Sequence, residues 1–179
     1  VMKKSVLLLF FAGCVATGIF GIGRKIPMNR VNDLGQREGY WRDSVGGGFV
    51  YDLYYKGGKK DGLYKRFYRN KLFLFGEYTA DNISGTWYMF GDEGELCCTI
   101  DSIELNKDSI YTGYPCCRIF RKYKCYCTDY YPGGGVEKEG YMVCDEEFEI
   151  EIWEIGEWKY YDESGNLIKT KDYGDRRTP

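Results

Sequence analysis

The clearest alternation of apolar and polar positions lies at Phe148, Ile150 and Ile152, which are separated from one another by glutamates. A period of two places the apolar side chains on one face of a β-strand and the acidic side chains on the other. The alternation changes phase after Trp153, which predicts a bulge or a strand end at that point.

A second pattern is a glycine followed two positions later by tryptophan or tyrosine. Its four copies are Gly39-Tyr-Trp41, Gly62-Leu-Tyr64, Gly85-Thr-Trp87 and Gly156-Glu-Trp158. The first three glycines lie 23 residues apart in both intervals. A fixed period of this length is typical of stacked repeat proteins.

Turn residues follow the third and fourth copies at the same distance. Gly-Asp-Glu-Gly occupies 91–94 and Asp-Glu-Ser-Gly occupies 162–165, where glycine is free to adopt a positive φ. Each copy therefore predicts a strand, a tight turn and a second strand. A lone hairpin is marginal in water, so we expect the hairpins to stack and bury their aromatic residues between neighbours.

These repeats predict an all-β chain, built as an elongated antiparallel sheet of stacked hairpins. We expect Gly85 and Gly156 to be structural, because they need either a positive φ or close packing. We expect Trp41, Trp87 and Trp158 to be core residues rather than contact residues.

The motif G-x-W/Y-x-x-Y/F, followed by a D/E-x-G turn and leucine, resembles the MORN repeat. The chain is more closely similar to bacterial MORN-variant proteins that are often labelled as antitoxins of toxin–antitoxin systems. The resemblance covers 39–96 and 139–168 and leaves out the cysteine-rich middle, 97–135. It implies successive hairpins in an elongated, curved sheet that contacts protein or lipid.

The first 23 residues predict an export signal. Lys3 and Lys4 precede an apolar run, and Ala12-Gly13-Cys14 follows. Phe11–Cys14 resembles a bacterial lipobox, which implies lipidation at Cys14. The uncharged segment from Ser5 to Gly23 is also long enough to span a bilayer as an uncleaved helix, and ordinary secretion is a third possibility. All three predict a protein at the cell envelope, facing the periplasm or exterior.

The 179 residues predict one domain. Residues 1–23 form the signal peptide or anchor and 24–36 a tether. The MORN-like domain spans 37–168, with the cysteine-rich segment at 97–135. Residues 169–179 form a polar tail.

Seven cysteines follow Cys14: Cys97, Cys98, Cys116, Cys117, Cys125, Cys127 and Cys144. Their spacing is a poor match for zinc, and the chain has no histidine, so sites that mix cysteine and histidine are excluded. In an exported protein we expect disulfides between the clusters. Buried thiols and a metal site are the alternatives, and sequence cannot give the connectivity.

The second repeat is basic, with Lys56, Lys59, Lys60, Lys65, Arg66, Arg69 and Lys71. A solvated outer face explains such a run. The alternative is a patch for anionic lipid or polymer.

We predict no enzymatic activity, no catalytic or metal-binding residues and no cofactor. The absence of histidine removes the Ser-His-Asp and Cys-His mechanisms, and no phosphate-binding glycine motif occurs. Paired carboxylates do not indicate a hydrolase here, because any chain with 27 acidic residues contains some.

The predicted function is binding. An envelope-anchored MORN-like module would contact a protein partner through exposed aromatic residues, which bury large areas at low entropy cost. The alternatives are an antitoxin or immunity-type role and carbohydrate binding at the envelope. We expect no nucleic-acid partner, and no feature of the sequence identifies the protein partner.

Overall fold

The computed structural model describes residues 27–108, 111–112, 119–145 and 153–174. The predicted signal or anchor segment with Cys14, the alternating segment 147–152, Cys116 and Cys117 lie outside these residues. The described residues are all-β and antiparallel and contain no helix, which confirms the predicted fold class for the body of the chain. No helix in this described part is long and apolar enough to cross a membrane.

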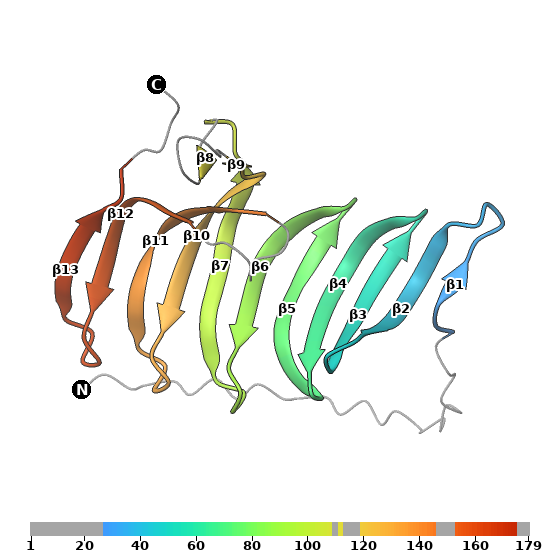
Figure 1. Cartoon of the computed structure of the whole chain (residues 1–179), viewed down its shortest axis with the longest axis horizontal. Coiled ribbons are helices and arrows are strands. Elements are labelled where there is room, and N and C mark those ends of the chain that lie inside the picture. The colour runs from blue at the N-terminus through green and yellow to red at the C-terminus, as the bar shows by residue number, and fades with distance from the viewer. Residues whose placement is uncertain (1–26, 109–110, 113–118, 146–152, 175–179) are drawn as a thin grey trace, which may run out of the picture.

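Eleven strands form one open sheet, and two short strands pair separately. The sheet strands are β1 (Arg30–Val31), β2 (Arg37–Val45), β3 (Phe49–Lys56), β4 (Lys59–Tyr68), β5 (Lys71–Thr79), β6 (Asn82–Phe90), β7 (Leu96–Leu105), β10 (Tyr123–Tyr130), β11 (Val136–Cys144), β12 (Trp153–Tyr161) and β13 (Leu167–Asp172). Strands β8 (Tyr111–Thr112) and β9 (Ile119–Phe120) lie between β7 and β10 in the chain. Neighbours in sequence are neighbours in the elongated sheet (Figure 1).

The predicted hairpins at the four glycine motifs are β2–β3, β4–β5, β6–β7 and β12–β13. A fifth hairpin, β10–β11, lies largely within the segment that the sequence analysis left outside the repeats. The sheet also extends beyond the predicted limits. β1 pairs with β2 inside the predicted tether, and β13 continues to Asp172.

One turn type recurs four times in the sheet. Three copies lie along its lower edge in Figure 1, and the copy between β1 and β2 lies at the opposite edge. In each case the first residue donates its N–H to the carbonyl of the fifth, and the fourth donates to the carbonyl of the first. These turns are 32–36, 91–95, 131–135 and 162–166. The fourth residue is always a glycine with φ between +73° and +89°, at Gly35, Gly94, Gly134 and Gly165. The predicted turns at 91–94 and 162–165 are therefore present.

The repeat glycines all adopt the left-handed region that side chains disfavour. Gly39, Gly62, Gly85 and Gly156 have φ of +75°, +122°, +65° and +59°. A Cβ at Gly85 would meet only Glu77, 3.8 Å away, and one at Gly156 would meet nothing within 4 Å. At these two positions the requirement is thus a positive φ and not close packing.

Two tryptophans pack across the boundary between successive hairpins. Trp87 lies over Gly76 of β5 and Trp158 lies over Gly140 of β11, because a Cβ on either glycine would overlap the indole ring. Both tryptophans are fully buried. A glycine on the preceding hairpin therefore makes room for the large ring.

In other hairpins the repeat position holds a side chain smaller than tryptophan, and the residue opposite it on the preceding strand is larger than glycine. Tyr64 lies opposite Leu53, and Cys127 lies opposite Ile100. Cys127 precedes its turn by four residues, as Trp87 does, so it stands at the tryptophan position of the repeat. The paired volumes compensate each other, as close packing requires.

Candidate functional site

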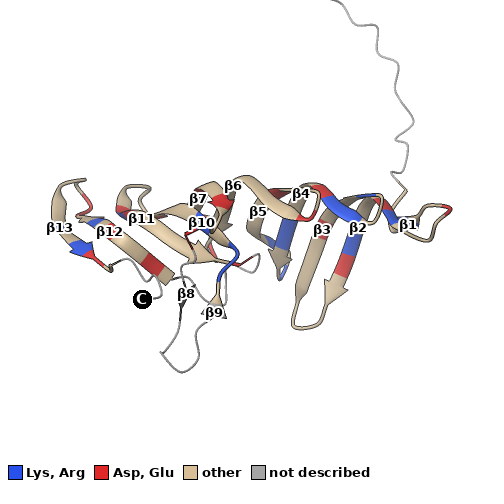
Figure 2. Ribbon diagram, turned by 90° about the horizontal axis from the view of Figure 1, so that it is seen from above, with Lys and Arg blue, Asp and Glu red and all other residues tan. Residues whose placement is uncertain are grey.

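The strand registers divide the side chains between two faces of the sheet. We call one the core face; it carries Leu53, Tyr64, Leu74, Trp87, Ile100, Cys125, Cys127, Met142 and Trp158, all buried. The other, the open face, carries Tyr40, Tyr54, Leu63, Phe75, Tyr88, Tyr126 and Tyr141, none of them buried. Within the described ranges the strands form this one sheet and the short β8–β9 pair, which stands out from the sheet near β7 and β10 (Figure 2), so no second sheet packs against it.

Three aromatic pairs run along the open face, each formed across two neighbouring strands. Their ring centroids are 5.4 Å apart for Tyr40–Tyr54, 5.9 Å for Phe75–Tyr88 and 5.1 Å for Tyr126–Tyr141. Each pair consists of residues directly opposite in the register. Such pairs stabilise the sheet and also expose ring edges and hydroxyls to solvent.

The ring orientations decide what the pairs can bind. The interplanar angles are 50° for Tyr40–Tyr54, 29° for Phe75–Tyr88 and 80° for Tyr126–Tyr141. A sugar ring stacks on one flat aromatic face, so an extended glycan needs successive rings in a common outward plane. Within the Tyr40–Tyr54 and Tyr126–Tyr141 pairs the two rings are not coplanar, and the mixed apolar and hydroxyl surface of the pairs fits a protein contact.

A shallow hollow of about 140 Å³ lies at the first aromatic pair and is lined by Tyr40, Asp52, Tyr54, Leu63 and Lys65. Arg42 binds the Asp52 carboxylate at its floor in a bidentate pair, with both N–O distances 2.6 Å. Burial and a hydrogen bond with Asp52 raise the pKa of the Tyr40 hydroxyl, so it stays a neutral donor. The hollow thus combines aromatic rings with a fixed charge pair.

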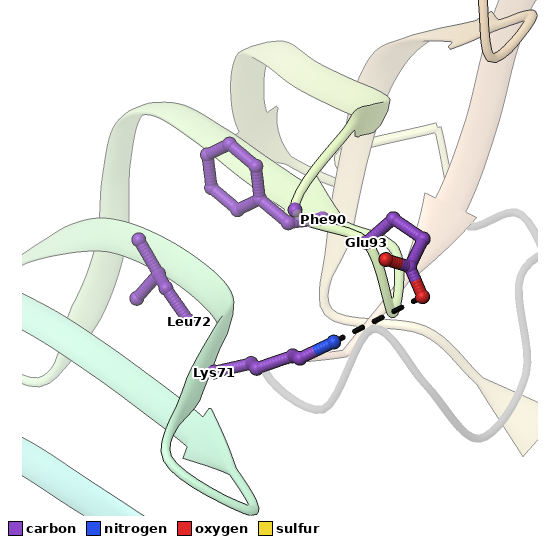
Figure 3. A pocket seen from close by; sticks show the side chains of 5 residues that line it. Lys71, Leu72, Phe90 and Glu93 are labelled. Atoms are coloured by element: carbon purple, nitrogen blue, oxygen red, sulfur yellow. Dashed lines mark ion pairs between the residues drawn. The ribbon is translucent and has the colours of Figure 1, made fainter.

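A second hollow, of about 330 Å³, lies between two turns at the lower edge of the sheet. Leu72 and Phe90 form its apolar walls, and Lys71 reaches across to the turn 91–95 (Figure 3). Lys71 donates a hydrogen bond to the carbonyl of Asp92 and lies 4.0 Å from Glu93. Both charged side chains are largely exposed, so the ion pair contributes little. This second hollow lies between two turns, and its lining residues do not direct several polar groups at one point where a ligand could bind.

Near the end of β11 and the start of β12, residues of the open face are buried. Val143 and Ile155 are buried there and pack with Trp153. The three aromatic pairs span the sheet from β2 to β11.

The predicted repeat-core residues lie on the core face and are not contact residues of the open face. Trp87 donates its indole N–H to Ser84 O at 3.1 Å, and Trp158 donates to Tyr141 O at 2.7 Å. Trp41 is only half-buried, and its indole N–H finds no acceptor among the described residues. It belongs to the β2–β3 hairpin, which is preceded among the described residues only by the two-residue strand β1.

The basic residues of the second repeat do not all lie on one face of the sheet. Lys65 lines the open-face hollow, whereas Arg66 packs over Phe49 on the core face, 4.4 Å from the ring centroid. Lys60 stacks 4.7 Å from the Tyr78 ring. These cations cover aromatic rings at separate places along the sheet.

Four of the predicted disulfide cysteines form two contacting pairs on the core face. The sulfurs of Cys98 and Cys127 are 3.3 Å apart, and those of Cys125 and Cys144 are 3.2 Å apart. All four are thiols in the structure. Hydrogen bonding to Cys127, and then burial, raise the pKa of the Cys98 thiol, so it is neutral and a poor nucleophile. Cys97 is half-buried on the opposite face.

Among the described residues, Cys98, Cys127 and Asp129 form a group whose ligand atoms lie within 4.8 Å of one another. The Asp129 carboxylate is also 3.3 Å from the Lys138 ammonium. The Lys138 ammonium therefore already neutralises the negative charge of Asp129 that would attract a metal ion.

No protein-family model, curated protein or solved structure matches this chain. Sequence reasoning missed the open-face pairs and the glycines Gly76 and Gly140. The sequence does contain a signal that Tyr40 and Tyr88 face away from the core. Each is adjacent to a repeat tryptophan, and successive side chains of a strand point to opposite faces.

Proposed function

We propose that the protein is a non-enzymatic MORN-like repeat protein that binds a protein partner through the open face. The observation that carries this proposal is the row of three aromatic pairs on a sheet face that no second sheet among the described residues packs against. Tyrosine offers a large contact area with little side-chain entropy to lose, and its hydroxyl hydrogen-bonds at a wet interface.

A protein partner fits this face better than an anionic lipid surface. At the first pair, Arg42 and Asp52 are bound to each other and neutralise each other, and Lys65 is one further cation that lines the hollow. A lipid surface would favour a gathered set of unpaired cations. In two of the three pairs the rings are inclined to each other by 50° and 80°, so neither of these pairs forms one flat platform for a sugar ring.

The test compares capture by the full chain with capture by a double variant, Tyr54→Ala with Tyr141→Ala. These tyrosines are 38% and 45% exposed, so their removal should leave the fold intact. A matched control removes two exposed side chains at the sheet edge, Leu167→Ala with Ile168→Ala. We expect a partner whose affinity falls about tenfold or more in the tyrosine variant and is unchanged in the control.

Two outcomes would overturn this proposal. One is a partner lost only in the edge control, which would place the contact on β13. The other is binding of the full chain to arrayed glycans that the tyrosine variant abolishes, which would make the face a carbohydrate site.

The N-terminal segment is proposed to anchor the module at the cell envelope through lipid on Cys14. Cys14→Ser should block incorporation of labelled palmitate and leave an unprocessed precursor. Absence of lipid on the unchanged protein would remove the lipid anchor, and recovery from the cytoplasm on fractionation would favour the antitoxin-type role.

A further inference from the structure

The cysteine pairs on the core face share one geometry. Cys127 lies opposite Ile100, two residues from Cys98, and Cys125 lies opposite Met142, two residues from Cys144. Each pair is therefore diagonal across neighbouring antiparallel strands, on a single face of the sheet. One pair joins β7 to β10, and the other joins β10 to β11.

We propose that these are two disulfide sites with the pairing Cys98–Cys127 and Cys125–Cys144. The sulfurs are 3.3 Å and 3.2 Å apart, so an S–S bond of about 2.05 Å needs a movement of about 0.6 Å by each sulfur. This proposal rests on the geometry of the sheet and is independent of the partner that the open face binds.

The other pairings among these residues do not fit the sheet. Cys97 points to the opposite face from its neighbour Cys98, because successive side chains alternate along a strand. Cys125 and Cys127 lie on one strand with Tyr126 between them, and each already contacts a sulfur on a different strand.

Oxidation of each pair is a thiol–disulfide exchange that needs a disulfide oxidant such as oxidised glutathione. A cysteine thiolate attacks the glutathione S–S bond, forms a mixed disulfide and releases one reduced glutathione. The second thiolate then displaces the other glutathione. Two electrons pass to the oxidant, and the two cysteine protons end on the two glutathione thiols.

Burial determines when these bonds can form. Cys125 and Cys144 are fully buried, Cys127 is 1% exposed and Cys98 is 6% exposed. An oxidant cannot reach such thiols in the folded chain, so the bonds must form during folding. Once formed, the two bonds link β7 to β10 and β10 to β11 covalently. The first bond spans the chain segment that contains β8 and β9.

A metal site explains only one of the two pairs. Asp129 could complete a set with Cys98 and Cys127, but its carboxylate is already paired with Lys138. The Cys125–Cys144 pair has no third ligand of this kind among the described residues. Disulfide formation accounts for both pairs by one chemistry.

The experiment refolds the full chain, in mild detergent, from the denatured and reduced state in a buffer of reduced and oxidised glutathione. Free thiols are then blocked with N-ethylmaleimide, and the protein is digested with trypsin and chymotrypsin for mass spectrometry. Cleavage after Tyr126 separates Cys125 from Cys127. We expect both proposed links in the unchanged protein, and blocked thiols in the folded reduced protein only after denaturant is added.

Variants assign each link. Cys98→Ser should abolish the first link and leave Cys127 alkylated, while the second link persists. Cys144→Ser should do the reverse and leave Cys125 alkylated. Cys97→Ser is the matched control, because it removes the neighbouring thiol and should retain both links.

Three results would overturn the proposal. They are four alkylated cysteines after refolding, links from any of the four to Cys97, Cys116 or Cys117, and a stoichiometric metal ion bound with the thiols unlinked. The mapping of the unchanged protein decides between these results even if a variant fails to fold.

Discussion

At the residue scale, the repeats are held together by size matching across neighbouring strands. Glycine faces tryptophan at Gly76–Trp87 and Gly140–Trp158, leucine faces Tyr64, and isoleucine faces Cys127. The motif therefore tolerates different aromatic and small residues, provided that the neighbour on the preceding hairpin changes with them.

Trp87→Ala should destabilise the protein by about 3–5 kcal/mol, because it removes a fully buried indole and leaves a cavity. Urea unfolding measures this loss. Lys59→Ala, an exposed position in the same array, should change stability by less than about 0.5 kcal/mol. Unchanged stability of the tryptophan variant would contradict its core role.

Gly76→Leu should cost about 1–3 kcal/mol or more, because the new side chain overlaps the Trp87 ring. Adding Trp87→Tyr recreates the Leu53–Tyr64 combination found one hairpin earlier. The double variant should therefore be more stable than Gly76→Leu alone, as a double-mutant cycle would show. Simple additivity of the two losses would argue against size matching.

At the element scale, two of the four turns, 32–36 and 162–166, are stabilised by the side chain of their first residue. The Oδ1 atom of Asp162 accepts hydrogen bonds from the N–H groups of Ser164 and Asn166, both at 2.9 Å. Asn32 forms the same bonds to Leu34 and Gln36 at 3.0 Å. Aspartate and asparagine are thus interchangeable in this turn, apart from charge.

The pKa of Asp162 is lowered, first by the hydrogen bond from the Asn166 backbone and then by the Asn166 side chain. A carboxyl whose pKa is lower in the folded state stabilises the fold above its unfolded pKa of about 3.9. That contribution is lost as the pH falls through the folded pKa. The melting temperature should therefore drop less below about pH 4 in Asp162→Asn than in the unchanged protein. If the melting temperatures of the two proteins changed with pH in the same way, the prediction would be wrong.

At the scale of the whole molecule, each hairpin touches only its neighbours in an open sheet. The two edges are unequal. β1 has two residues, whereas β13 is fully exposed and carries Lys169 and Lys171. Lysines on an edge strand disfavour pairing with another chain.

Nearest-neighbour packing predicts local effects of core substitutions. In Trp87→Ala, hydrogen exchange should accelerate in β5, β6 and β7, which surround the cavity. Protection of β12 and β13 should be unchanged under native conditions. Equal acceleration across all strands, measured by mass spectrometry, would show a single cooperative unit instead.

The sequence by itself determined the hairpins of the four glycine motifs and the turns at 91–94 and 162–165, and it limited Gly85 and Gly156 to a positive φ or close packing. These features depend on local chemistry: glycine at fixed offsets, turn residues, and aromatic side chains suited to a half-buried sheet. The resemblance to MORN repeats and the export signal stay predictions, because the described residues do not test them.

Only the tertiary structure decided which residues meet across strands. The fifth hairpin escaped sequence analysis because cysteine stands at its tryptophan position, at Cys127. Gly76 and Gly140 escaped because their role is set by a ring on the next hairpin, 11 and 18 residues away. The thiol pairs and the open-face aromatic pairs likewise follow from strand register, which is fixed by packing over long sequence separations. A neighbouring tryptophan places Tyr40 and Tyr88 on a face of their strands, but it does not name the residue opposite each of them.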